Sequence, residues 1–424
     1  SNREYIRQTT GQFYSRRFVM TYPNEQLPAG RPLRKAPAYD AMTAAGANWG
    51  CSWGLEVPLL FAPPGFSETP TLKRSNAFPI VAEECAVVRE GVGLLDISGF
   101  SRYQVTGPNA RAWLDRLMAS RLPSPGRARL APMLAPSGRL KGDLTLLNWG
   151  DGSWWIMGSY YLRQWHMRWF CDHIEEGVEV HDISDAVVGF GLAGPRSRDV
   201  LASITHEDLS HQALGFLGCT TLDVGLIRAK VVRLSVCGEL GYEINCSAAE
   251  HITLRETLLE AGRQCGIRET GFYAMNSLRL EKSFGVWSAE FTQDRTPGMT
   301  GMDRWIDFSK PDFIGRTAAL EEHEKADPPQ RLVTLEIDAD DADSSSYEPV
   351  WVGDTRVGFT TSGGYGHYTG KSLAMALVDS AVNNDTDLAV HVVGRQQGAR
   401  ILSEPAWDPA GDRMRTSAPS LSSR

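Results

Sequence analysis

The sequence predicts a mixed α/β protein that ends in a small all-β domain. Between residues 76 and 328, short apolar strands alternate with amphipathic helices, which is typical of a mixed α/β body built from two subdomains. After the acidic, serine-rich segment 338–346, β-rich runs lie between Gly and Asn-Asp turns, and they predict a barrel or sandwich over residues 329–424. Residues 1–75 are rich in Gly, Pro and aromatic side chains and predict an N-terminal extension that wraps a surface.

Each element follows from a local pattern. Apolar residues three or four positions apart predict helices, as Ala110, Trp113, Leu114 and Leu117 do, and short apolar runs bounded by turns predict strands. The turn Gly150-Asp151-Gly152 indicates a hairpin. In chain order we expect a helix at 3–18, a strand at 103–105, a helix from 110, strands at 143–148 and 154–158, a helix at 160–175, strands at 186–193, 228–236 and 242–246, helices at 248–265 and 270–284, and β-rich runs at 331–337, 349–352, 356–361, 372–378 and 387–393.

Composition excludes several functional classes. The formal net charge is −8 and the isoelectric point is about 5.7, so no basic excess is present to neutralise the phosphates of a nucleic acid. No apolar run approaches the ~18–20 residues that span a bilayer. Residues 1–17 are polar and do not form a signal peptide, so we expect a cytoplasmic protein with no membrane partner. The first residue is Ser1 rather than Met, which is compatible with a trimmed, processed or excised piece.

The metal-ligating residue types form no site, so we expect no metal. The seven cysteines are odd in number and include no Cys-x-x-Cys pair, which is typical of reduced thiols rather than structural zinc. The nine histidines form no ligand set; His206 and His211, five positions apart, do not share a helical face.

Two phosphate-binding patterns fail on context. Residues 189–194 fit G-x-G-x-x-G, but the glycines fall inside an apolar run rather than after it, and Pro195 follows at once. Gly370-Lys371-Ser372 resembles the end of a phosphate loop, but the position that requires its first glycine is Tyr365.

Asp143 stands where an apolar strand begins, in the segment 137–146. One interpretation is a strand-start aspartate that caps a turn. The other is a carboxylate held at the edge of a cavity for proton transfer or charge stabilisation.

Two further blocks carry charges inside apolar surroundings: Gly238–Glu243, which contains Glu239 and Tyr242, and Tyr273–Lys282, which contains Arg279. Glu239 fits either a turn or a ligand-binding carboxylate. Arg279 lies between two leucines, and a buried arginine needs a carboxylate or an anionic ligand, although a surface ion pair with Glu281 is the alternative. The tryptophans, Trp287 among them, are more often core than cofactor platform.

Taken in order, these blocks resemble a known family. Asp96-Ile97-Ser98, Gly138 to Thr145, Leu192 to Pro195, Gly238 to Gly241 and Leu278 to Glu281 are similar to the tetrahydrofolate-dependent aminomethyltransferases, the glycine cleavage T-protein family. The similarity is greater still to the folate-binding C-terminal half of dimethylglycine and sarcosine dehydrogenases, and it covers residues 20 to 405.

The resemblance implies three domains in a disc around a central funnel that holds tetrahydrofolate. It implies that Asp143 is the carboxylate near the reacting nitrogens of the cofactor and that Glu239 binds the pterin edge. Arg279 would brace Glu239, Trp287 would form an aromatic wall, and Tyr242 would complete the cofactor-binding set. We expect Phe100, Cys237 and Met299 to lie where the donor substrate enters.

Two departures from the family pattern concern the donor. Val236-Cys237 precedes Gly238, and Gly298-Met299-Thr300-Gly301 replaces an acidic segment, so both changes favour a more apolar substrate. The FAD-binding domain of the dehydrogenases is not part of this sequence. Three hypotheses follow: a one-carbon transferase that moves a methyl or methylene group from a small donor to tetrahydrofolate, the folate-binding half of an FAD amine dehydrogenase with a flavoprotein partner, and a non-catalytic folate-binding module.

Overall fold

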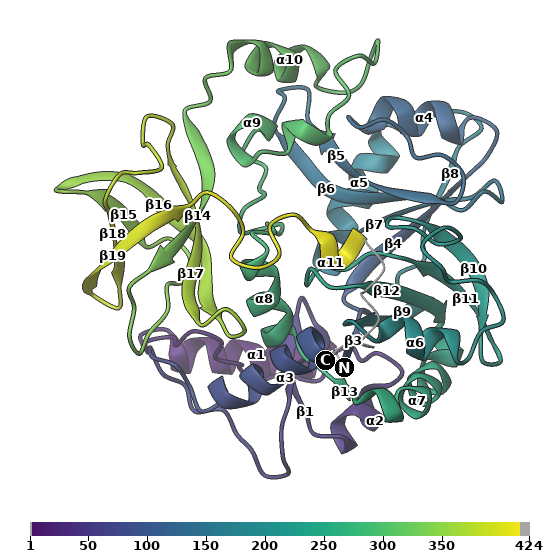
Figure 1. The fold of residues 1–424 in the computed structure, drawn as a ribbon, viewed down its shortest axis with the longest axis horizontal. Coiled ribbons are helices and arrows are strands. Elements are labelled where there is room, and N and C mark those ends of the chain that lie inside the picture. The colour runs from purple at the N-terminus through teal and green to yellow at the C-terminus, as the bar shows by residue number, and fades with distance from the viewer. Residues whose placement is uncertain (1, 416–424) are drawn as a thin grey trace, which may run out of the picture.

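Three bodies are arranged as a disc in the computed structural model, which describes residues 2–415 (Figure 1). The closed barrel lies on the left of Figure 1 and the two large sheets lie on the right. The barrel resolves the choice between barrel and sandwich, and the mixed α/β prediction is confirmed. A two-stranded hairpin, β1 (Ala47–Ser52) and β2 (Leu55–Phe61), stands apart from them.

The strand orders define the three bodies. The six-stranded sheet contains, in order, β10 (Cys219–Val224), β11 (Ile227–Val232), β12 (Gly241–Ser247), β9 (Val187–Ala193), β3 (Val92–Asp96) and β13 (Ile267–Glu269). The five-stranded sheet contains β5 (Arg127–Leu134), β6 (Leu140–Asn148), β7 (Trp154–Ser159), β4 (Phe100–Thr106) and β8 (Glu179–Asp182). The barrel contains β14 (Gln330–Ile337), β17 (Lys371–Asp379), β16 (Thr355–Gly366), β15 (Pro349–Val352), β18 (Leu388–Val392) and β19 (Arg395–Leu402).

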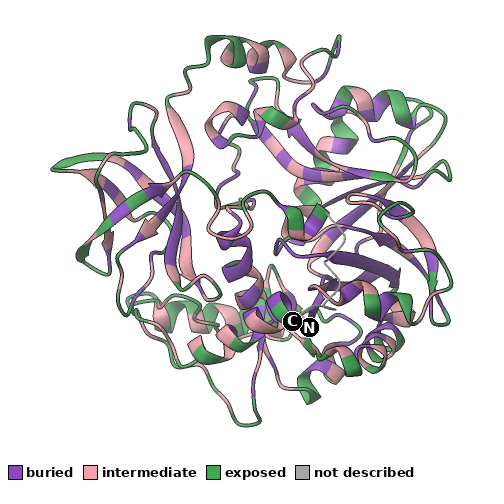
Figure 2. Ribbon diagram, in the orientation of Figure 1, coloured by how far each residue is buried: buried purple, intermediate pink, exposed green. Residues whose placement is uncertain are grey.

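The helices that matter for the site are α3 (Phe78–Glu90) and α8 (Phe272–Glu281), which pack against each other. α8 also contacts the barrel strands β16 and β17, so it stands between the body and the barrel. Its ribbon is mostly purple in Figure 2, whereas α1 (Asn2–Arg16) has no buried residue. The remaining helices are α2 (Tyr39–Ala44), α4 (Ala110–Leu117), α5 (Arg163–Asp172), α6 (Ser197–Ala202), α7 (His251–Ala261), α9 (Pro297–Thr300), α10 (Arg316–Lys325) and α11 (Asp412–Arg415). None of the helices within residues 2–415 has both the length and the apolar character that crossing a membrane requires.

Strand alternation sets which side chains reach the core. In β6, Leu140, Gly142 and Leu144 are buried, whereas Lys141 and Asp143 are half-buried. Since successive side chains point to opposite faces of a sheet, Asp143 lies on the face opposite to the core leucines. β6 thereby holds a carboxylate on a rigid strand.

The structure changes the expected role of residues 1–75. The hairpin β1–β2 and the helix α2 lie in this segment, and Leu60 and Met42 are completely buried in the cores of the body. β2 is apolar along almost its whole length and contains Pro58, so it shows no strand alternation that would reveal it.

Two expected helices are shorter than their patterns. Over residues 248–265 the α-helical part is α7, with a 3-10 turn on each side at 248–250 and 263–265. Over residues 270–284 the helix is α8, which ends before Ser283, whose φ is +56°. A residue with positive φ cannot continue a right-handed helix.

After β19 the chain leaves the barrel and returns to the body. Residues 403–415 end in α11, drawn in yellow near the middle of Figure 1. The last part of the predicted C-terminal domain, residues 416–424, lies outside the described residues.

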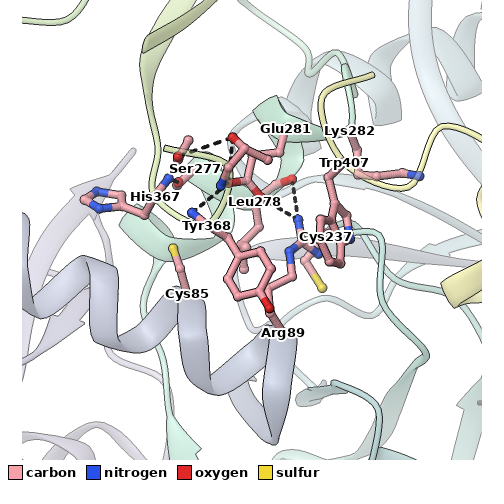
Figure 3. Close-up of polar contacts among 12 residues, drawn as sticks. Cys85, Arg89, Cys237, Ser277, Leu278, Glu281, Lys282, His367, Tyr368 and Trp407 are labelled. Carbon is pink, nitrogen blue, oxygen red and sulfur yellow. Dashed lines mark hydrogen bonds and ion pairs between the residues drawn. The ribbon is translucent and has the colours of Figure 1, made fainter. Parts of the chain in front are cut away.

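A buried arginine joins these parts. Arg89, at the end of α3, donates to the Cys237 carbonyl at 2.7 Å and forms ion pairs with Glu281 at 2.7 Å and Glu239 at 3.2 Å. Figure 3 shows Glu281 between Arg89 and the barrel, where its other oxygen accepts the backbone N–H of Tyr368 at 2.9 Å. One guanidinium therefore ties α3, α8 and the loop before β12.

Replacing Arg89 by Met is expected to lower the free energy of unfolding by about 3–5 kcal/mol, because the buried Glu281 carboxylate loses its cation and the buried Glu239 carboxylate keeps only Arg413. Urea unfolding followed by circular dichroism measures this loss. As a control, Arg116→Met removes an exposed pair with Glu175 and should cost about 1 kcal/mol or less. Equal effects of the two substitutions would contradict the role given to Arg89.

Candidate functional site

A small, mainly apolar cavity lies against the six-stranded sheet. Its volume is about 40 Å³, and it is bounded by strands β3, β9 and β12, the loop 234–237 and α8. The lining residues that matter below are Leu95, Ile97, Phe100, Cys237, Glu243 and Met275.

Glu243 is the carboxylate of this cavity. It lies on β12, it is 8 % exposed, and its carboxylate makes no hydrogen bond with any other side chain or backbone group in residues 2–415. Burial raises the pKa of Glu243 to about 7, and the nearby Arg102 guanidinium opposes this shift. An unpaired acid in an apolar cavity is a feature of ligand-binding sites rather than of cores.

Arg102 connects β12, which carries Glu243, to residues 97–100, which border the same cavity. It is fully buried on β4, and its guanidinium donates to Asn245 Oδ1 at 2.7 Å, to the Phe100 carbonyl at 3.0 Å and to the Ile97 carbonyl at 3.2 Å. Burial lowers the pKa of Arg102 to about 10, so it remains a cation at neutral pH. The positive charge near Glu243 therefore favours the ionised form of that acid.

Asp143 does not line this cavity. Its carboxylate has no side-chain partner among the described residues, and burial raises its pKa to about 7. Burial also raises the pKa of Tyr161, and the Asp143 carboxylate nearby adds to that shift. A carboxyl group with a pKa near neutrality can both take up and release a proton at physiological pH.

Both carboxylate oxygens of Glu239 accept hydrogen bonds from other side chains of the protein. Besides Arg89, its oxygens accept from Trp407 Nε1 at 3.1 Å and from Arg413 Nε at 3.0 Å. Gly238 permits this arrangement, since its φ is +84° and a Cβ there would lie 2.4 Å from Lys282 Cγ. Glu239 is therefore an anchor for the C-terminal segment and does not line the cavity.

Arg279 does not brace Glu239, which corrects the expected pairing. Its Nη1 binds Glu290 at 3.2 Å, and Arg89 takes the place beside Glu239. Trp287 lies in an apolar cluster with Phe291 and Met302, and its carbonyl accepts from the Tyr161 hydroxyl at 3.1 Å.

The other predicted site residues divide into two groups. Phe100, Cys237 and Tyr242 border the cavity of Glu243, although the Tyr242 hydroxyl accepts from Arg198 at 3.1 Å on the core side. Met299 lies in α9 and does not border the cavity. The structure thus brings three of the eight predicted residues to the cavity of Glu243 and leaves five outside it: Asp143, Glu239, Arg279, Trp287 and Met299.

Sequence reasoning missed Glu243 and Arg102 as site residues. Glu243 lies in the same segment, Gly238–Glu243, as the predicted Glu239. The alternation of side chains along β12 could have identified it. Tyr242 and Ile244 belong to the core, so Glu243 between them has to face the other side of the sheet.

The three-part disc and its acid-bearing cavity define an aminomethyltransferase-like protein. The family model "GCVT N-terminal domain" matches residues 38–310, and "Glycine cleavage T-protein C-terminal barrel domain" matches residues 330–408. The chain belongs to the glycine cleavage T-protein family, which confirms the resemblance found in the sequence motifs and supports tetrahydrofolate as the cofactor. Residues 1–36 match the "FAD dependent oxidoreductase central domain".

Individual relatives agree with this assignment. Mitochondrial dimethylglycine dehydrogenase of Mus musculus is 32 % identical over 97 % of this chain and 48 % of its own length. An aminomethyltransferase of Anoxybacillus flavithermus is 28 % identical over 78 % of this chain and 91 % of its own length. The crystal structure of aminomethyltransferase T from Bartonella henselae shares the fold, with a TM-score of 0.76, 24 % identity, and coverage of 89 % of this chain and 99 % of that one. The chain spans about half the length of the dimethylglycine dehydrogenase that it matches.

Replacing Asp143 by Asn is expected to stabilise the protein more at pH 8 than at pH 5. Because the pKa of Asp143 is raised from 3.8 to about 7, the folded state holds a proton that the unfolded chain has released, and stability falls as the pH rises through this window. The Asn variant has no such loss. Its free energy of unfolding relative to the wild type should therefore be on the order of 2 kcal/mol more favourable at pH 8 than at pH 5.

Urea unfolding at the two pH values measures the difference. Asp312→Asn, at an aspartate that is largely exposed, serves as the control and should show no comparable pH dependence. A gain for Asp143→Asn that is identical at both pH values would contradict the raised pKa.

Proposed function

We propose that this protein transfers a methyl or methylene group from a small donor to tetrahydrofolate, which gives 5-methyl- or 5,10-methylene-tetrahydrofolate and leaves a demethylated product. The observation that carries the proposal is the unpaired Glu243 carboxylate in an apolar cavity of a T-protein fold. A methyl group would come from a small donor such as an N-methyl amine, and a methylene group from a donor that already carries the carbon at that oxidation level, such as a methylenedioxy aromatic.

The residues at the cavity fit the cofactor by their chemistry. The pterin edge presents several N–H groups side by side, and a carboxylate accepts two such donors at once. Leu95, Ile97 and Phe100 supply apolar walls for a flat ring. The enclosed volume of about 40 Å³ holds only the edge of such a ring, so the rest of it would extend beyond the cavity.

The chemistry divides between two carboxylates. Tetrahydrofolate supplies the nucleophilic nitrogen that accepts the one-carbon unit. Glu243, kept near the cation Arg102, binds and orients the donor edge of the ring. We assign Asp143 the proton-handling role, because its pKa of about 7 suits a group that takes up and releases a proton at neutral pH.

A second candidate function has its own observation. Residues 1–36 match the central domain of FAD-dependent oxidoreductases, and dimethylglycine dehydrogenase is about twice as long as this chain. In that case the chain works beside a flavoprotein domain or partner and captures the one-carbon unit that amine oxidation releases. As for the compartment, we keep the cytoplasm as the proposal, to be tested by cell fractionation, although the mouse relative is described as mitochondrial.

Product analysis separates these functions. Purified protein and tetrahydrofolate should yield 5-methyl-tetrahydrofolate from N-methyl donors and 5,10-methylene-tetrahydrofolate from methylenedioxy donors, detected by mass spectrometry. Turnover that requires an added flavoprotein would favour the second function. Folate binding without turnover under either condition would leave a non-catalytic folate-binding module.

Substitution of Glu243 should affect cofactor binding, whereas substitution of Glu239, four residues earlier, should affect stability. Glu243→Gln is expected to weaken tetrahydrofolate binding about 10- to 100-fold, because a charge-assisted pair of hydrogen bonds is lost, while the fold is retained. Glu239→Gln should leave the affinity within about threefold and instead lower stability, because it weakens a buried ion pair.

Calorimetric titration with tetrahydrofolate between pH 6 and pH 8 tests the role of Glu243 in a second way. The wild-type affinity should rise with pH as Glu243 ionises, since the pKa of this acid is about 7, and the rise should be absent in Glu243→Gln. Loss of binding in Glu239→Gln alone would reverse the assignment.

A further inference from the structure

A second, larger cavity lies where α8 meets the barrel. Its volume is about 420 Å³, and its walls come from residues 68–78, from α8, from residues 343–346 and from β16. It shares no lining residue with the cavity of Glu243, because Met275 and Leu278 of α8 face that cavity whereas Asn276 and Arg279 face this one.

Arg279 borders this cavity with one side of its guanidinium unused. The residue is 6 % exposed, and Nη1 donates to the Phe284 carbonyl at 3.1 Å and to Glu290 at 3.2 Å. Nε is buried without a partner, and Nη2 makes no hydrogen bond with any group in residues 2–415. Nε and Nη2 together form the edge of arginine that binds a carboxylate with two parallel hydrogen bonds.

Glu290 cannot cover that edge. Its carboxylate is completely buried and also accepts from Val286 N at 2.9 Å, Thr361 Oγ1 at 2.7 Å and Ser362 Oγ at 2.6 Å. These bonds hold it on the Nη1 side of Arg279. The unused edge is therefore a fixed property of this packing.

Arg74 shows how the same edge is satisfied in the same cavity. Its Nε and Nη2 each donate to the Asp343 carboxylate at 2.9 Å, and its guanidinium lies 4.2 Å from the centre of the Tyr365 ring. Among the described residues, a carboxylate thus fills the Nε/Nη2 edge of Arg74 but not the same edge of Arg279, whose carboxylate partner Glu290 lies at Nη1.

Neighbouring groups suit a small carboxylate ligand. Asn276 lies one helical turn before Arg279, is exposed, and its amide makes no hydrogen bond with the described part of the chain. Farther along the wall, the Glu68 carboxylate accepts from the Tyr273 hydroxyl at 3.0 Å and offers a negative group for an amine. We propose that this cavity binds a small carboxylate, of the amino-acid class, through Nε and Nη2 of Arg279.

Calorimetric titration without folate tests the proposal independently of the transferase activity. The probe is N,N-dimethylglycine, and N,N-dimethylglycinamide is its neutral counterpart. The acid should bind at least about tenfold more tightly than the amide, because only the acid accepts both donors of the arginine edge. Equal affinities for acid and amide, or no binding of either, would overturn the proposal.

Substitutions locate the binding. Arg279→Lys keeps the charge beside Glu290 but removes the two-donor edge, so the affinity for N,N-dimethylglycine should fall at least about tenfold. Asn276→Ala, at an exposed position that does not threaten the fold, should lower it about threefold. Arg255→Lys, at an arginine whose edge is already filled by Glu269, is the matched control and should leave the affinity unchanged. Unchanged affinity in both Arg279→Lys and Asn276→Ala would refute the site.

A second titration identifies the source of the carboxylate. If Arg279→Lys weakens binding of tetrahydrofolate but not of tetrahydropteroate, which lacks the glutamate, the site serves the cofactor's own tail. If it weakens binding of N,N-dimethylglycine alone, the site serves a free amino acid. Either result supports a carboxylate site.

Discussion

The buried charge of Arg89 is the constraint on which the other features depend. The same guanidinium binds the Cys237 carbonyl at the wall of the Glu243 cavity and the carboxylate of Glu281 at the end of α8. Glu281 in turn accepts the backbone N–H groups of Tyr368 and Thr369 in the barrel. Because an unpaired charge in the interior is costly, none of these parts can shift alone. The cavity wall, the helix and the barrel therefore keep one relative position.

Local patterns in the sequence were enough to predict about half of the strands and helices, and with them the fold class, but not α3, which carries Arg89. Alternation in β6 and helical spacing in α4 depend only on neighbouring residues, so they could be recognised directly. Barrel closure could not, because it requires β14 to pair with β19 and β15 with β18, far along the chain. The hairpin β1–β2 was missed because β2 is buried on both faces and shows no alternation.

The sequence predicted which segment contributes an acid to the site, but not which acid of that segment lines the cavity. Glu239 and Glu243 both lie in one short segment, and nothing local distinguishes them as ligand-binding acids. Their environments differ because Trp407 and Arg413 reach Glu239 from 168 and 174 positions away, whereas no described side chain pairs with Glu243. Arg279 was recognised as a buried arginine from its apolar neighbours, but its partner Glu290 depends on the turn that follows α8.

The return of residues 403–415 to the body has a consequence for the order in which the protein is completed during synthesis. Arg413 donates to the Arg89 carbonyl and to Glu239, 324 and 174 positions earlier. A ribosome makes the chain from its N-terminal end, so the whole body emerges before Glu239 can receive Trp407 and Arg413. Contacts between such distant positions form late, and the chain that waits for them exposes incompletely packed surface. The surface around Glu239 and the end of α3 therefore stays incompletely packed in the nascent protein until residues 407–413 have been made.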